Sequence, residues 1–173
     1  SEATKRTVLD DLEYKRTGDK SLKLDLYLPT TSPGPCPVVV WVGGGGWTVM
    51  SKHHGVSMAV WLTKRGLALA SIAYRVSSEA LFPAQIQDCK AAVRWLRANA
   101  DAYSLDAEHI GVWGDSAGGH LVILLGTTAG VSVPQRSTLP ASNSTTDKAS
   151  PMPAPAPIVR PSVLPNSATA PPK

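Results

Sequence analysis

The sequence predicts an α/β domain with a mostly parallel sheet, helical crossovers and a leading antiparallel hairpin. An alternating apolar pattern comes first, within residues 12–28. Three short apolar runs follow, and patterns with helical spacing separate them. Strands covered on both faces have continuous apolar sequences, and parallel strands need crossovers of this kind.

Leucines alternate with polar residues from Leu22 to Leu28, and Pro29 ends the pattern. A period of two residues is typical of a half-buried strand. Residues 12–16 are its expected hairpin partner, with the turn at 17–20.

The remaining elements alternate between strand and helix along the chain. The expected strands cover residues 38–42, 67–74 and 110–113. The expected helices cover about 55–65, the stretch from Pro83 to Ala100, and 121–125 after a glycine-rich turn.

The composition changes after Gly130. Ten of the 15 prolines lie in residues 131–173, and no aromatic residue follows Trp113. Such a segment cannot bury enough apolar surface to offset the entropy of ordering it. We therefore expect a partial domain over residues 1–130 and a disordered tail rich in Pro, Ser, Thr and Ala over 131–173.

Charge and hydropathy exclude two classes of partner. Most of the net charge of +4 comes from the tail. A nucleic-acid-binding surface would need a cluster of Lys and Arg with interleaved aromatic residues, and the sequence contains no such cluster. No apolar run approaches the ~18 residues of a membrane span. The chain starts at Ser1 without an apolar leader segment, and the compartment stays unassigned.

The segment Gly114-Asp115-Ser116-Ala117-Gly118 matches the G-x-S-x-G motif. It lies between an expected strand and an expected helix, which is the context that this nucleophile turn requires. A serine on such a turn exposes its hydroxyl, and the helix N-terminus offers N–H groups to a developing oxyanion. The pattern predicts a serine nucleophile rather than a plain tight turn.

Four glycines, Gly43 to Gly46, and Trp47 follow the strand at 38–42. A glycine run lets backbone N–H groups approach a reacting carbonyl closely, as in an oxyanion-binding loop. A flexible turn is the alternative. A phosphate-binding loop is excluded, because no Gly-Lys-Ser/Thr follows.

Together these stretches resemble the α/β-hydrolase fold esterases and lipases, in particular the bacterial esterases related to hormone-sensitive lipase and to feruloyl esterases. The matching stretches are Pro37 to Trp47, Tyr74-Arg75, Phe82 to Leu96 and Gly114 to Leu121. The resemblance implies Ser116 as nucleophile and the N–H groups of Gly44, Gly45 and Ala117 as oxyanion-hole donors. It implies hydrolysis of small carboxylic esters through an acyl-enzyme, as a carboxylesterase does, without metal or organic cofactor.

The sequence departs from the family pattern at two places. Gly43 stands where the family has a histidine before its glycines, and we expect a more mobile loop there. In this fold the acid and then the base follow the nucleophile, but only Asp147 and His120 come after Ser116. His120 lies one helical turn away and is expected to pack rather than act as a base. His53 and His54 follow the glycine loop near the expected mouth of the site, where either could approach Ser116, but solvated positions at a helix start are the favoured expectation. His109 is expected at the surface.

The expectation is therefore the N-terminal part of an α/β-hydrolase fold, truncated after the nucleophile turn, with a frameshift near residue 131 as one hypothesis. The strand at 110–113 would then present an open sheet edge and invite self-association. Two functions compete with a weakly active esterase. One is a catalytically silent fragment that acts by binding, and the other is an extracellular protein with a glycosylated stalk, suggested by the sequon at Asn143.

Overall fold

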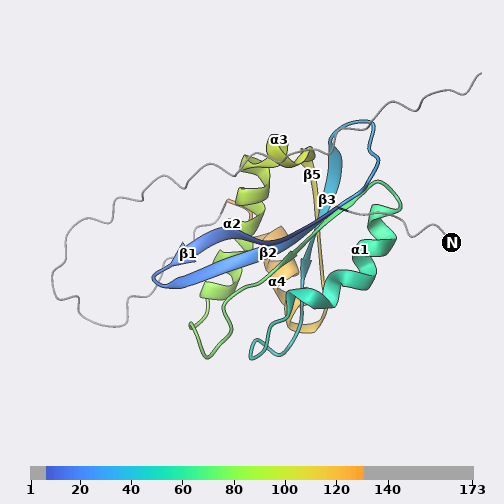
Figure 1. Cartoon of the computed structure of the whole chain (residues 1–173). Helices are drawn as coiled ribbons and strands as arrows, with labels where there is room; N and C mark the ends of the chain where they lie inside the picture. The colour runs from blue at the N-terminus through green and yellow to red at the C-terminus, as the bar shows by residue number, and fades with distance from the viewer. Residues whose placement is uncertain (1–6, 131–173) are drawn as a thin grey trace, which may run out of the picture.

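The computed structural model describes residues 7–130, which form a five-stranded sheet with helices on both faces (Figure 1). The strand order is β1-β2-β4-β3-β5. The strands are β1 (Thr7–Thr17), β2 (Lys20–Leu28), β3 (Cys36–Val42), β4 (Ala68–Ile72) and β5 (Leu105–Gly114). The predicted fold class, a partial α/β-hydrolase sheet, is confirmed for these residues.

The pairing follows the predicted pattern of a hairpin and then parallel strands. β1 pairs with β2, and β2 with β4, in antiparallel fashion. β3 lies between β4 and β5 and is parallel to both. Both β1 and β5 begin earlier than predicted, because β1 pairs with β2 from Thr7 and β5 pairs with β3 from Leu105.

The helices are η1 (Lys52–Gly55, a 3₁₀ turn), α1 (Val56–Thr63), α2 (Ala84–Ala98), α3 (Ala100–Tyr103) and α4 (Ser116–Thr127). α1 covers one face of the sheet, and α2 and α4 cover the other (Figure 1). The short α3 was not predicted, because four residues carry no readable period.

Helix α4 corrects one expectation. The sequence indicated a glycine-rich turn before a helix at Leu121, but α4 already begins at Ser116 and includes Gly118 and Gly119. Each glycine weakens a helix by about 1 kcal/mol relative to alanine, so helix propensity does not indicate the first turn of α4. Close packing of the helix on the end of β3 requires glycine at Gly118.

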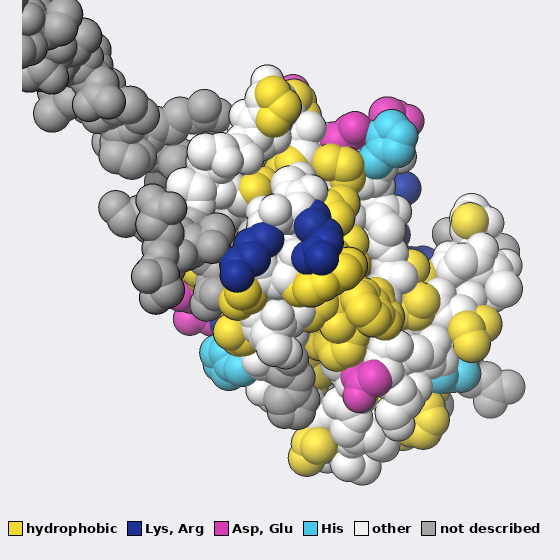
Figure 2. All heavy atoms as spheres, turned by 90° about the vertical axis from the view of Figure 1, so that its right-hand side faces the viewer, with side chains coloured by type: hydrophobic (Ala, Val, Ile, Leu, Met, Phe, Trp, Pro, Cys, Tyr) yellow, Lys and Arg dark blue, Asp and Glu magenta, His cyan; other side chains and the backbone are white. Residues whose placement is uncertain are grey.

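Strand β5 is one of the two outer strands of the sheet among residues 7–130, as expected for the stretch 110–113, and β1 is the other. Trp113 on β5 is 48% exposed and Ile123 on α4 is 65% exposed. Figure 2 shows hydrophobic side chains gathered on the side of the molecule where α1 lies. The tail, with Asn143 and Asp147, lies outside the described residues, and none of the described helices is long and apolar enough to cross a membrane.

Candidate functional site

Three loops meet at the carboxyl ends of the parallel strands. The glycine loop (Gly43 to Trp47) follows β3, Tyr74 follows β4, and Asp115 and Ser116 follow β5. Adjacent parallel strands place their carboxyl ends at one edge of a sheet, where open α/β folds bind ligands. The topology therefore brings the glycine loop and the serine motif together and places the segment at Tyr74 at the same edge of the sheet.

Ser116 stands at the junction of β5 and α4. Its φ is +47°, in the left-handed region that a residue with a side chain rarely adopts, and it is exposed. Such backbone conformations cost on the order of 1–3 kcal/mol and persist where the surroundings enforce them. The expected strand–serine–helix junction is present.

The glycines on either side of Ser116, Gly114 and Gly118, permit the close packing around this turn. A Cβ at Gly114 would lie 2.7 Å from the carbonyl oxygen of Val42, and a Cβ at Gly118 would lie 2.0 Å from the same oxygen. Both positions therefore allow α4 to pack against the end of β3 at a distance that no other residue permits.

The glycine loop packs directly on the serine turn. A Cβ at Gly44 would lie 2.9 Å from the carbonyl oxygen of Asp115 and 3.1 Å from Cβ of Ser116. The Gly44 N–H donates to Oδ1 of Asp115 at 2.7 Å. The carboxylate of Asp115 thus engages one of the three N–H groups that the resemblance implied as oxyanion donors, whereas Ala117 lies in the first turn of α4.

Hydrogen bonds also hold the rest of the glycine loop. The Tyr74 hydroxyl donates to the Gly43 carbonyl at 2.8 Å, and the Ser77 N–H donates to the Trp47 carbonyl at 2.7 Å. Burial of Tyr74 raises its pKa to about 12, with a smaller contribution from the negative charge of Asp115. The loop is therefore tethered at several points, whereas the four glycines alone suggested backbone mobility.

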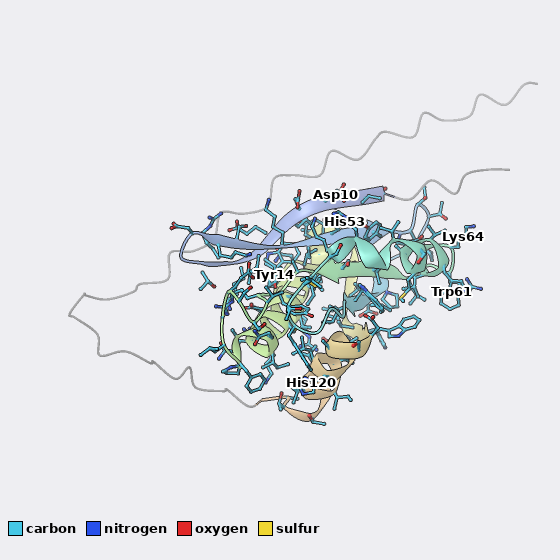
Figure 3. The ribbon with its side chains drawn as sticks, turned by 90° about the horizontal axis from the view of Figure 1, so that it is seen from below. Asp10, Tyr14, His53, Trp61, Lys64 and His120 are labelled. Atoms are coloured by element: carbon cyan, nitrogen blue, oxygen red, sulfur yellow. The ribbon has the colours of Figure 1, made fainter. Side chains whose placement is uncertain are left out.

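The three histidines whose side chains the structure describes, His53, His109 and His120, lie on different elements, and the side chain of His54 lies outside the described part. His120 on α4 contacts the edge of Trp47 at 5.5 Å between ring centroids, which agrees with the packing role expected for it. His53 lies beside the β1–β2 hairpin, with Nδ1 3.9 Å from Oδ2 of the buried Asp25 (Figure 3). His109 is exposed at the surface.

His109 pairs with Asp106 at 2.7 Å, and this hydrogen bond lowers the pKa of the Asp106 carboxyl. Among the side chains that the structure describes, none makes a hydrogen bond to the Ser116 hydroxyl, so these side chains assemble no acid–base pair on it. The same part of the chain has no group of three or more His, Cys, Asp or Glu side chains that could hold a metal ion.

Sequence reasoning missed two residues that shape the site. The hydrogen bond from Gly44 to the Asp115 carboxylate was not foreseen from the sequence. Tyr74 was noted only as part of a matching stretch. Its position at the carboxyl end of a strand adjacent to β3 is the signal that could have placed it near the glycine loop.

The sheet, the crossover helices and the strained serine turn define an α/β-hydrolase fold, of which the described residues form a part. The family model described as BD-FAE matches residues 24–150, and the chain belongs to this family of α/β-hydrolase esterases. The match includes residues beyond Gly130, in the segment that differs in composition.

Individual relatives agree with the family. Esterase LipC of Mycobacterium tuberculosis is 39% identical over 113 residues, which are 64% of this chain and 28% of LipC. A bifunctional GH43-CE protein of Bacteroides eggerthii is 42% identical with a TM-score of 0.65, over 70% of this chain and 17% of that one. Esterase Est2 of Thermogutta terrifontis, solved with propionate bound, is 30% identical with a TM-score of 0.61, over 69% and 44% of the two chains.

The chain is thus related to carboxylic ester hydrolases. It spans less than half the length of each of these three relatives.

Proposed function

We propose that this chain carries the nucleophile half of a carboxylic-ester hydrolase site, with Ser116 as the attacking residue. In the proposed reaction the Ser116 oxygen attacks the carbonyl carbon of an ester, and the alcohol leaves with the serine proton. Water then hydrolyses the acyl-enzyme and regenerates the hydroxyl. Acyl transfer of this kind requires neither a metal nor an organic cofactor.

The observation that supports this proposal is the conformation of Ser116. It is an exposed serine in a strained backbone conformation, between the end of a parallel strand and the first turn of a helix. Strained residues of this kind concentrate at functional sites, and a helix N-terminus stabilises negative charge.

The proposed oxyanion hole uses backbone N–H groups from two segments. Ala117 offers its N–H from the first turn of α4, and Gly45 offers one from the glycine loop. The Gly44 N–H donates to the Asp115 carboxylate, so it can join the hole only after that bond opens. N–H donors fixed in advance stabilise the transition state because they need no reorganisation.

The proposed substrates are esters of short acyl groups, including acetylated sugars. Relatives support this class, because Est2 was solved with propionate and another similar structure is a truncated carbohydrate esterase from gut microbiota. Only weak turnover is expected, because a serine without a general base is a poor nucleophile and no described histidine or carboxylate is hydrogen-bonded to the hydroxyl.

Turnover of p-nitrophenyl acetate tests the proposal, together with labelling by a fluorophosphonate probe and mass spectrometry of the modified peptide. The expected result is slow turnover and labelling at Ser116, both abolished by Ser116→Ala. The matched control is Ser21→Ala, at a serine on the hairpin. Equal labelling of wild type and Ser116→Ala would remove the basis for the proposal.

The second candidate is a catalytically silent fragment that binds a second copy of itself through the outer strand. The exposed Trp113 on β5 favours this reading, because an unpaired strand edge with apolar side chains promotes association. Sedimentation velocity at rising concentration would show association in the wild type and less in Trp113→Lys. A monomer at every concentration would exclude it.

A further inference from the structure

The peptide unit that joins Gly43 to Gly44 is held at both ends. Its carbonyl accepts from the Tyr74 hydroxyl at 2.8 Å, and its N–H donates to Oδ1 of Asp115 at 2.7 Å. Because the C=O and N–H of one trans peptide point in opposite directions, the two bonds fix the orientation of its plane. Rotation of this unit would break both bonds at once.

Tyr74 is itself held firmly in place. The carbonyl of Ala73 accepts from the Tyr14 hydroxyl on β1, and the N–H of Arg75 donates to Asp88 on α2 at 3.1 Å. The Tyr74 side chain is only 2% exposed. The residues on both sides of Tyr74 are thus tied to other elements, and its side chain is buried.

The tie through Asp88 is an ion-pair network. The Arg75 guanidinium donates to both oxygens of Asp88, at 2.8 and 2.9 Å, and Lys15 on β1 pairs with the same carboxylate at 2.6 Å. Asp88 is fully buried. Hydrogen bonds between charged groups with this two-pronged geometry are stronger than neutral ones, so the segment that carries Tyr74 is well fixed.

We infer that Tyr74 is a positioning residue of the glycine loop, whose hydroxyl fixes the Gly43–Gly44 peptide beside Ser116. The glycine loop needs such a support from another segment, because its four consecutive glycines have no side chains to restrict their backbone. The next N–H along the chain is that of Gly45, a proposed oxyanion donor. The role in reactivity rests on the proposed function, whereas the role in ordering the loop does not.

Tyr74→Phe tests the inference, because it removes the hydroxyl and keeps the ring. The first measurement is amide hydrogen exchange of Gly44 by NMR. We expect about fivefold or faster exchange than in wild type, as for the loss of a hydrogen bond of about 1 kcal/mol. The Val40 amide in β3 reports global opening, and Tyr103→Phe is the matched control at another buried tyrosine.

Unchanged exchange at Gly44 relative to Val40 in Tyr74→Phe would overturn the ordering role. The second measurement is the rate of fluorophosphonate labelling at Ser116, which we expect to fall about fivefold in Tyr74→Phe and to stay unchanged in Tyr103→Phe. Equal labelling rates in the two variants would overturn the positioning role. Absence of labelling in wild type with faster Gly44 exchange in Tyr74→Phe would instead reject the proposed function and leave the ordering role standing.

Discussion

Replacing Gly118 by alanine should displace helix α4 from the end of β3 and disrupt the serine turn. The added Cβ would lie 2.0 Å from the Val42 carbonyl oxygen and 2.9 Å from the carbonyl carbon of Gly43. An ordinary contact needs about 3.4 Å, so the helix must retreat by roughly 1 Å or more, because backbone atoms cannot rotate aside as side chains do.

Overpacking of this kind typically costs about 1–3 kcal/mol, and we expect a loss of about 3 kcal/mol in the free energy of unfolding for Gly118→Ala. Urea denaturation followed by tryptophan fluorescence measures it. Gly126→Ala is the matched control, because Gly126 lies in the same helix with open space around it. That variant should gain about 0.5–1 kcal/mol from helix propensity. If both variants changed stability in the same direction, the close approach of α4 to β3 would be refuted.

Three further predictions concern the glycine loop and its supports. Gly43→Ala should stabilise the protein by about 0.4–1 kcal/mol, because its Cβ meets no atom closer than 3.4 Å. Gly44→Ala should destabilise it by about 1–3 kcal/mol, because its Cβ would lie 2.9 Å from backbone. Urea denaturation measures the change in the free energy of unfolding for both variants, and changes of the same sign would contradict the loop geometry. Burial raises the pKa of the Tyr74 hydroxyl from its usual value near 10 to about 12. The contribution of the neutral hydroxyl to the free energy of unfolding is therefore complete below pH 10 and is lost as the pH rises toward 12. Between pH 8 and pH 11 the wild type should therefore lose on the order of 1 kcal/mol more than Tyr74→Phe, and equal losses would mean that the hydroxyl is solvated. Asp88→Ala should cost about 3–5 kcal/mol, because it leaves the nearly buried Arg75 unpaired. Thermal denaturation checks this, and a loss below about 1 kcal/mol would place Asp88 in the range of a surface ion pair.

The order and type of the main elements could be predicted because each has a local period. The alternating leucines of β2 and the apolar run of β3 appear in the sequence as strands, and the structure confirms both. The serine turn was also predictable, because glycine, serine and glycine at fixed spacing are needed wherever a strand turns sharply into a close-packed helix. The first turn of α4 was not, since the same glycines reduce helix propensity.

The support of the glycine loop was beyond sequence reasoning. Tyr74 and Gly43 are 31 residues apart, and Gly44 and Asp115 are 71 residues apart. No local pattern links such pairs, because their contact depends on which strands are neighbours in the sheet. The expectation of a mobile loop came from counting glycines, whereas the tethers come from residues on other strands.

The sequence alone determined the α/β class, the leading hairpin and the placement of a serine between a strand and a helix, because these depend on residue types at short spacing. Only the tertiary structure decided that Asp115 engages Gly44, that Tyr74 holds Gly43 and that no described histidine side chain is hydrogen-bonded to Ser116. The physical reason is that hydrogen bonds depend on distance and direction in space, and strand order sets both.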